Sequence, residues 1–274
     1  MSISTTPNTQ GQAPAVELDV DAWRRDGFLH VPGVFDADRL AELRSWVDDV
    51  ATRPYGDGGL LQHYEVGDAG PQIARSENLL DHGGFRDLIA QGTLVEMGGR
   101  LLGEPIVLYK EKINYKLSGG AGFIAHQDAP AYKFVDMHLT CMVAIDDATL
   151  DNGCLEAVAG LHDELLPDDG DGCVDPNVAV GLDWLALPMR AGDLLWFHSL
   201  APHRSGPNLT STTRRALFCT YNAAREGDLR EQYYADKLRY FAETGAPSTR
   251  VSTVGGFDGI EPTVEQLREI GALS

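Results

Sequence analysis

The sequence predicts a mainly β domain, a sandwich or jelly-roll-like barrel with helices packed outside it. Two observations point to this fold class. From about residue 105 the chain becomes a series of about seven short β-prone runs, separated by Gly, Pro and Asp. Before that point, and again near the C-terminus, apolar residues recur at helical spacing. Short strands with turn residues between them are typical of barrels and jelly rolls.

Three segments are predicted to be helical. In DADRLAELRSWVDDV, which begins at Asp36, four apolar residues share one helical face, and Asp36 is a suitable N-cap. These residues are Leu40, Leu43, Val47 and Val50. A second stretch, FRDLIAQGTLVEMGGRLLG, ends in glycines, and REQYYADKLRYFAE predicts an amphipathic helix near the C-terminus.

The β-prone runs follow the second helical stretch in order. They are IVLYKEKINYKL, FIAHQD, HLTCMVAID, CLEAVA, WLALPM, DLLWFHS and RRALFCTYN. The acidic segment DELLPDDGDGCVDPN reads as a solvated loop. We therefore expect a disordered lead-in over residues 1–18 and one domain over 19–274. Within that domain we expect a helical flank to about 104, a strand core over about 105–223 and a helical segment after it.

Composition excludes several classes of function. The net charge of −19 disfavours nucleic acid and anionic membranes as partners, because both require a basic surface. The N-terminus lacks the basic and apolar regions of a signal peptide, and no apolar run is long enough to span a membrane. The four cysteines are scattered, as reduced thiols are in cytoplasmic proteins. We expect a cytoplasmic protein with a small-molecule partner.

A possible metal motif lies in GGAGFIAHQDAPAYK, where His126 and Asp128 are two residues apart. On a strand, residues at this spacing point to the same face and can bind one ion. A His-x-Asp match arises by chance in a chain this rich in acids, so it needs support from elsewhere. Asp136 and His138 have the same spacing in reverse order and are a competing pair.

A third ligand has to come from another strand, and His198 and His203 are the candidates. Two neutral imidazoles and one carboxylate on one face leave coordination positions open, which is typical of non-haem iron(II) oxygenases. Zinc sites more often close a tetrahedron with further thiolates or imidazoles. The ligand set by itself leaves manganese and zinc open.

An arginine at a fixed distance from the distal histidine is the second part of the signal. Arg214 comes eleven residues after His203, at the start of a β-prone run, and either Arg214 or its neighbour Arg215, which faces the opposite side of the strand, can supply the cation. A planar bidentate cation suits the far carboxylate of a dicarboxylate cosubstrate whose other end chelates the metal. Ser205 lies two residues after His203 and can donate to the same carboxylate.

These motifs together resemble the phytanoyl-CoA dioxygenase family of Fe(II)- and 2-oxoglutarate-dependent oxygenases. The resemblance covers roughly residues 24–223, through RRDGFLHVPGVFDADRLAELR, YKEKINYKLSGGAGFIAHQD, DNGCLEAVAGLH and GDLLWFHSLAPHRSGPNLTSTTRRAL. It implies a double-stranded β-helix, of the jelly-roll, cupin-like kind. It implies Fe(II), 2-oxoglutarate and O2 as cofactor and cosubstrates. Iron would be held by His126, Asp128 and His203, and 2-oxoglutarate by Arg214, Ser205, Asn114 and Thr140. Because some relatives with a small residue in place of the aspartate bind halide, the presence of Asp128 favours hydroxylation over halogenation.

Substrate residues are predicted from one strand and the segment after the metal motif. Lys110, Lys112, Asn114 and Lys116 alternate onto one strand face, which would hold an anion if that face lines the site. By resemblance, Lys112 takes the position of a substrate-facing cation. Tyr132 and Phe134, together with Tyr64, would hold a cationic head group by cation–π contact.

Three segments resemble sequences of bacterial organophosphonate hydroxylases: KEKINYKLSGGAGFIAHQDAPAY, HRSGPN and EQYYADK. These act on 2-aminoethylphosphonate or its trimethylammonio analogue at the carbon next to phosphorus. The sequence thus predicts a hydroxylase of such a small zwitterion.

The sequence also allows other interpretations. The three lysines can equally form a solvated edge-strand face. The oxygenase chemistry can act on an amino acid, a betaine-like osmolyte or a natural product, because fold does not determine substrate. A zinc or manganese cupin-like hydrolase or isomerase, and a non-catalytic scaffold, are the rival classes. His138, His162 and His198 are expected to be structural or solvated, with His198 as a substitute ligand.

Overall fold

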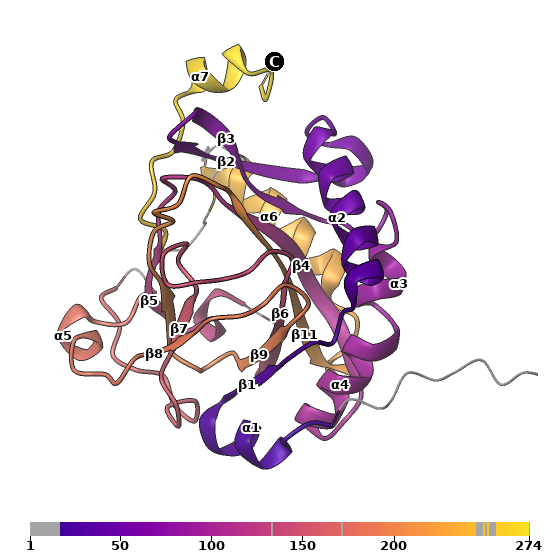
Figure 1. Ribbon diagram of the computed structural model, residues 1–274, viewed down its shortest axis with the longest axis vertical. Coiled ribbons are helices and arrows are strands. Elements are labelled where there is room, and N and C mark those ends of the chain that lie inside the picture. The colour runs from indigo at the N-terminus through magenta and orange to yellow at the C-terminus, as the bar shows by residue number, and fades with distance from the viewer. Residues whose placement is uncertain are drawn as a thin grey trace, which may run out of the picture.

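The computed structural model describes residues 17–132, 134–170, 172–244, 249, 251 and 256–273, and it has the predicted mainly β architecture (Figure 1). The strands are β1 Phe28–Val31, β2 Leu61–Gly67, β3 Gly70–Glu77, β4 Ile106–Lys116, β5 Phe123–His126, β6 His138–Ala144, β7 Leu155–Ala157, β8 Leu185–Leu187, β9 Leu194–His198, β10 His203–Ser205 and β11 Arg214–Ala223. The helices are α1 Val20–Asp26, α2 Ala37–Thr52, α3 Phe85–Ile89, α4 Gly92–Leu102, α5 Pro176–Ala179, α6 Arg230–Thr244 and α7 Val264–Glu269, with short 3-10 turns η1 Asp57–Gly59, η2 Ala129–Ala131 and η3 Ala224–Glu226.

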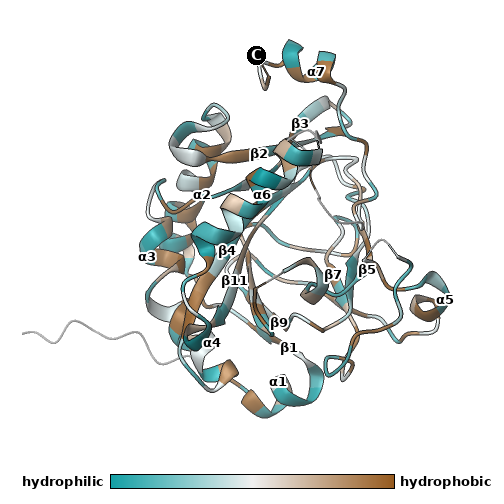
Figure 2. Cartoon of the chain, turned by 180° about the vertical axis from the view of Figure 1, so that it is seen from behind, coloured by the Kyte–Doolittle hydropathy of each residue, from teal (hydrophilic) through white to brown (hydrophobic). Residues whose placement is uncertain are grey.

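The strands form two antiparallel sheets. The larger has the order β1-β9-β6-β11-β4-β3-β2, and the smaller has the order β5-β10-β7-β8. Figure 1 shows α2, α3 and α4 on the outer side of the larger sheet, while the smaller sheet and α5 lie on its other side. Seen from behind in Figure 2, α6 lies across β4 and β11 with hydrophilic residues along its outward side. This arrangement is a jelly-roll core flanked by helices, as predicted.

Two apolar clusters hold these layers together. The larger one lies between the outer face of the seven-stranded sheet and the helices, and it includes Leu43, Val47 and Trp196. The smaller one lies between the two sheets and includes Met142 and Phe197. The inner face of the larger sheet is therefore only partly apolar, which leaves room there for polar side chains.

The predicted α2 is confirmed, whereas the second helical prediction needs a correction. The Asp36 side chain accepts from the backbone N–H of Arg39 at 2.9 Å, as an N-cap should. The segment predicted as one helix is two, because α3 ends at Ile89 and α4 begins at Gly92. Gly92 has φ = 66°, a left-handed conformation that breaks the helical path.

The N-terminal flank is less helical than expected, because it also contributes β1, β2 and β3 to the large sheet. Of the predicted lead-in, residues 1–16 lie outside the described residues. Leu18 is buried in the larger core cluster, so the ordered core begins slightly before the predicted boundary. The single-domain organisation stays a prediction. Among the described residues, no helix has the length and apolar character to cross a membrane.

Strand β4 places its lysines on the inner face of the large sheet. It pairs with β11 so that Lys112 lies opposite Phe218 and Lys116 lies opposite Arg214. The register shifts between Thr220 and Tyr221, which leaves Tyr109 as an extra residue in β4. Tyr109 and Lys110 consequently both reach the same neighbour, the ring of Tyr132.

Candidate metal centre and adjoining cavity

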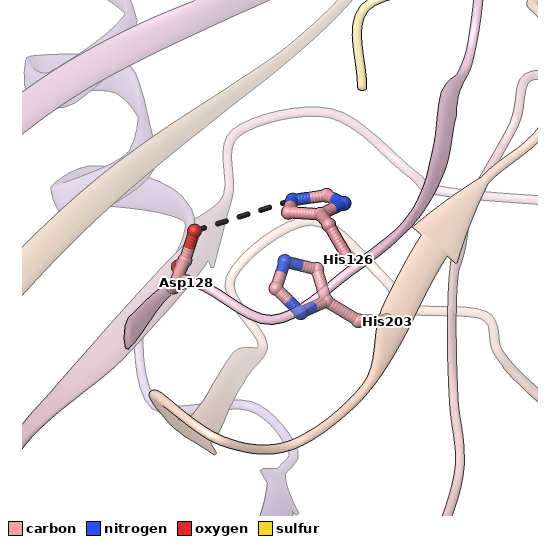
Figure 3. Close-up of side chains that lie close together, drawn as sticks. All are labelled: His126, Asp128 and His203. Carbon is pink, nitrogen blue, oxygen red and sulfur yellow. Dashed lines mark ion pairs between the residues drawn. The ribbon is translucent and has the colours of Figure 1, made fainter. Parts of the chain in front are cut away.

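His126, Asp128 and His203 come together between the two sheets (Figure 3). His126 is the last residue of β5 and His203 the first of β10, and the two are Cα partners across these strands. One ligand atom from each of the three residues lies within 4.8 Å of the others. The distance from His126 Nε2 to Asp128 Oδ1 is 4.0 Å. Among the described residues this is the one such group that could hold a metal.

Backbone carbonyls fix the orientation of both imidazoles. His126 Nδ1 donates to the carbonyl of Ile124 at 2.8 Å, and His203 Nδ1 donates to that of Ala201 at 3.0 Å. A carbonyl only accepts, so Nδ1 carries the proton in each ring and Nε2 keeps its lone pair. Hydrogen bonds of this kind to the second nitrogen orient most metal-binding histidines.

Asp128 reaches the centre from a turn, contrary to the expected strand position. Strand β5 ends at His126, and Asp128 precedes the short turn η2. Gln127 fixes the path between them, because its buried amide donates to the carbonyls of Glu164 and Leu200, at 2.9 and 2.6 Å. Its Oε1 also accepts from the N–H of Leu166 at 2.8 Å. The middle residue of the motif therefore holds the two ligands in place.

The electrostatics of the group match the ligand states that a divalent ion needs. Burial, aided by the neighbouring His203, lowers the pKa of His126 to about 4, so this imidazole is neutral near pH 7. Burial acts to raise the pKa of Asp128, but the two imidazoles and the nearby lysines outweigh it and hold that pKa below its usual value. Neutral imidazole and ionised carboxylate are the donors of a non-haem iron site, so the residues fit Fe(II).

A cavity between the sheets adjoins this centre and collects most of the predicted site residues. All three ligands line it, and so do Asn114, Thr140, Ser205, Arg214, Lys112, Lys116 and Tyr132. Two predicted substrate residues, Lys110 and Tyr64, are buried but do not line it. The Tyr64 hydroxyl instead donates to Gln62 Oε1 at 3.2 Å. Phe134 is exposed and has φ = 83°.

One end of the cavity holds two adjacent cations, Arg214 and Lys116. Arg214 donates to the carbonyls of Asn152 and Gly153, at 3.3 and 3.1 Å. Lys116 Nζ donates to Ser205 Oγ at 2.9 Å and also to the carbonyls of Gly153 and Gly206.

These hydrogen-bond partners of Arg214 and Lys116 are neutral, and the carboxylate of Glu65 acts on Lys116 only electrostatically, so positive charge remains at this end for an anion. Burial, reinforced by the charge of Arg214, lowers the pKa of Lys116 to about 7. Burial lowers the pKa of Arg214 to about 10. An anion that lies between them would stabilise both charged forms.

The competing residues take other roles in the structure. Arg215 points away and pairs with Asp146 and Asp48. His198 lies beside the rings of Trp23 and His162. In the other candidate pair, His138 is buried while Asp136 is exposed, so this pair does not converge on the centre.

A buried ionic cluster beside Asp128 was not anticipated from the sequence. Glu77, 1% exposed, accepts from Lys237 Nζ at 2.6 Å and from Arg75 at 3.5 Å. Arg75 also donates to Asn114 Oδ1 at 3.0 Å, which links the cluster to the cavity wall. Lys110 and Lys112 complete the cluster and are close enough to lower the pKa of Asp128.

The lysines are placed unusually for this residue type. The chain has five, at positions 110, 112, 116, 133 and 237, and the four described ones lie in or beside the cavity or the Glu77 cluster. Lysine is normally a surface residue and is rarely buried without a partner. Burial lowers the pKa of Lys110 to about 7 and that of Lys112 well below its usual value. A site that holds several lysines at such a cost is typical of anion recognition.

Aromatic rings surround the Lys110 ammonium. Its Nζ lies 4.0 Å from the centroid of Tyr132 and 5.5 Å from that of Tyr233. The Tyr132 ring also lies 4.4 Å from the His138 ring and 5.6 Å from the Tyr109 ring. Tyr233 and Lys237 come from α6, so this helix supplies side chains to both the aromatic and the ionic part of the cluster.

Comparison with known proteins places these features in a family. Residues 23–216 match the family model described as phytanoyl-CoA dioxygenase. The chain is 46% identical over 248 residues to a methylphosphonate hydroxylase of Gimesia maris, covering 89% of this chain and 95% of that protein. It is 36% identical over 225 residues to a 2-aminoethylphosphonate dioxygenase of the uncultured bacterium HF130_AEPn_1, covering 80% and 86%. A solved structure, the α-ketoglutarate-dependent epimerase SnoN of nogalamycin biosynthesis, superposes with a TM-score of 0.62 at 26% identity, covering 75% of this chain and 82% of that one.

Proposed function

The chain belongs to the phytanoyl-CoA dioxygenase family and is an Fe(II)- and 2-oxoglutarate-dependent oxygenase. We propose that it hydroxylates an organophosphonate at the carbon bound to phosphorus. When bound, the iron supplies the oxidising chemistry that couples decarboxylation of 2-oxoglutarate to hydroxylation of the substrate. One oxygen atom of O2 goes to succinate and the other to the new C–OH group, with release of CO2. His126, Asp128 and His203 would hold the metal. The zinc or manganese hydrolase and the scaffold are not supported by this family membership.

The buried cations beside Asp128 are the observation that carries the phosphonate assignment. Lys112 lines the cavity, and Lys110 and Arg75 lie behind it on the same side. A phosphonate carries up to two negative charges on three oxygens and pairs well with several ammonium and guanidinium donors. A betaine or an amino acid, with a single carboxylate, would leave more of this positive charge uncompensated. The phosphonate hydroxylases among the relatives support the same choice.

The opposite end of the cavity fits the cosubstrate. Arg214, Lys116 and Ser205 would hold the far carboxylate of 2-oxoglutarate, and Asn114 and Thr140, which also line the cavity, would contact the cosubstrate as well. Thr140 Oγ1 shares a hydrogen bond of 3.0 Å with Thr220 Oγ1, so its position on the cavity wall is fixed. The two ends would thus separate the cosubstrate anion from the substrate anion.

We also propose a cellular location and a class of partner for the enzyme, which the family assignment does not give. All four cysteines lie in the described part of the chain, are buried and form no disulfide, which supports a cytoplasmic location. The acidic composition supports a small-molecule substrate and no nucleic-acid partner.

Turnover of phosphonates by purified protein tests the proposal directly. Protein loaded anaerobically with Fe(II) and 2-oxoglutarate is exposed to O2 with methylphosphonate, 2-aminoethylphosphonate, a betaine or an amino acid. We expect succinate and a 1-hydroxyphosphonate in equal amounts, measured by chromatography and phosphorus NMR. Slow succinate formation that no phosphonate accelerates would contradict the substrate assignment and leave the oxygenase in place.

Two lysine substitutions on β4 separate the two anion sites. We expect Lys116→Met to raise the KM for 2-oxoglutarate about tenfold to a hundredfold, the value of one charge-assisted hydrogen bond, with the phosphonate KM unchanged. Lys112→Met should do the reverse. Each variant is the control for the other, because the chemical change and the strand are the same. The assignment of the two ends is wrong if both variants raise the same KM.

A further inference from the structure

We propose, building on the proposed function, that the organic group of the substrate phosphonate is a small uncharged alkyl group and not an aminoalkyl or trimethylammonioalkyl group. The protein itself fills the place where a cationic head group would bind. The Tyr132 ring beside the phosphonate site is covered by Lys110, and among the described residues no acidic side chain at that end of the cavity is left for a substrate cation. Much of the remaining wall is apolar.

The aromatic ring next to the metal-binding group already contacts a cation of the protein. Tyr132 is 7% exposed and lines the cavity, but the ammonium of Lys110 lies 4.0 Å from its ring centroid. Tyr233, the second ring around this ammonium, is 5.5 Å away. An aromatic ring attracts a cation through its face, and a desolvated contact of this length is a favourable one. A trimethylammonium group would have to displace Lys110 or bind next to a like charge.

The carboxylates that could bind a substrate amine also have other partners already. Among the described residues, the carboxylates that line the cavity are Asp128 and Glu65. Asp128 belongs to the metal group. Glu65 Oε1 accepts from the N–H of Ala121 at 2.6 Å, and the cation that acts on it electrostatically is Lys116, at the cosubstrate end.

The acid nearest the buried cations is Glu77, which lies outside the lining. Glu77 accepts from Lys237 and Arg75. A substrate ammonium at the phosphonate end would therefore meet Lys112, with Lys110 and Arg75 close behind it, and would have no carboxylate of its own. Like charges this close in a poorly hydrated site repel one another strongly.

Apolar side chains form the wall that an alkyl group would contact. Those that line the cavity include Phe218, its Cα partner Met142 on β6, and Phe197 on β9. Phe218 lies directly opposite Lys112 in the β4–β11 pair, so a phosphonate held by Lys112 would place its carbon chain beside this ring. Burial of a methyl or ethyl group against such a wall is favourable, whereas an ammonium buried there would lack a charged partner and would compete for the Phe218 ring with the ammonium of Lys112, which lies 5.3 Å from its centroid.

Two pairs of substrates of equal shape test the inference in the wild-type enzyme. Propylphosphonate and 2-aminoethylphosphonate differ by a methyl group in place of an ammonium. The 3,3-dimethylbutyl- and 2-(trimethylammonio)ethylphosphonates differ by a carbon in place of the quaternary nitrogen. We expect kcat/KM for the neutral member to exceed that for the cationic member by about tenfold or more in each pair. Preference for the cationic members overturns the inference while the phosphonate assignment stands; if no phosphonate is turned over, both fall.

A variant then tests whether Lys110 is the cause. Lys110→Met removes the ammonium from the Tyr132 ring, and we expect the neutral-to-cationic ratio of kcat/KM to fall by about tenfold. Lys116→Met makes the same chemical change at the cosubstrate end and should leave the ratio unchanged when 2-oxoglutarate is saturating. A ratio that stays the same in Lys110→Met contradicts the role of Lys110. A cationic preference that disappears in Glu65→Gln would assign the amine to Glu65 and overturn the inference.

Discussion

Asp128→Asn removes the activity: we expect kcat/KM to fall by at least about a thousandfold, roughly 4 kcal/mol of transition-state stabilisation. The asparagine has nearly the same shape but offers a neutral amide oxygen, which is a poor ligand for Fe(II) beside two imidazoles. The change also removes the negative charge that faces Lys110 and Lys112. Iron content after anaerobic loading and succinate formation at saturating Fe(II) measure the two consequences separately.

His198→Asn is the matched control for this prediction. His198 is the substitute ligand that the sequence left open, and its Nδ1 accepts from the N–H of Leu200 at 3.0 Å. The Oδ1 of asparagine can accept the same bond, so the fold should be preserved and activity should stay within a few-fold of wild type. Loss of activity in His198→Asn together with its retention in Asp128→Asn would show that the ligand set is wrong.

The convergence of His126, Asp128 and His203 could be predicted because its signal lies in sequence spacing. His126 and Asp128 are two residues apart, and Arg214 follows His203 at a fixed offset, so short motifs carry most of the geometry. The strand argument for the first pair was nevertheless incomplete. Asp128 lies beyond the end of β5, and the hydrogen bonds of Gln127 bring it to the centre. A contact of Gln127 with segments that lie far away in the sequence cannot be read from the motif.

The sequence did not indicate the ionic cluster because β2 and β3 bury charged residues where a strand usually buries apolar ones. In β2 and β3 the side chains of His63, Arg75 and Glu77 are buried, where alternation rules expect apolar residues. Runs such as LQHYEVG and GPQIARSE were therefore not recognised as strands and were included in the predicted helical flank. Violations of local pattern of this kind are expected at functional sites, where polar groups are retained despite their cost. The sequence does not show that β3 pairs with β4, and this pairing is what brings Arg75 and Glu77 to the site.

Aromatic residues show a different limit of sequence reasoning. The sequence correctly indicated that Tyr132 lies near the site, but a ring near a site has two faces, and what covers them depends on distant residues. Here the β-bulge in β4 and the helix α6 bring Lys110 and Tyr233 to the same place. The ring that suggested a zwitterionic substrate thus binds a cation of the protein itself.

Glu77→Gln is expected to destabilise the protein by about 3–5 kcal/mol, because it leaves several buried cations without their counter-ion. Glu77 is 1% exposed and faces Lys237, Arg75 and the ring of His63, at 2.6, 3.5 and 3.7 Å. For a protein of this size the loss corresponds to a decrease in Tm of about 10 °C. Calorimetry of the metal-free protein measures it. The surface variant Glu42→Gln, which breaks an exposed pair with Arg39, should change stability by less than about 0.5 kcal/mol.

The pH dependence shows whether this loss arises from charge. Burial acts to raise the pKa of Glu77, but Lys237, His63 and Arg75 outweigh it and hold that pKa well below its ordinary value of 4.5. A carboxyl of lowered pKa stabilises the fold above its ordinary pKa and loses that effect as the pH falls toward the lowered value. The stability gap between wild type and Glu77→Gln should therefore be full at pH 7 and narrow below about pH 4.5. A second change, Lys237→Met in the Glu77→Gln background, removes one stranded cation and should restore part of the loss. A gap that persists unchanged in acid, or a double variant no more stable than Glu77→Gln, would mean that packing and not charge explains the position of Glu77.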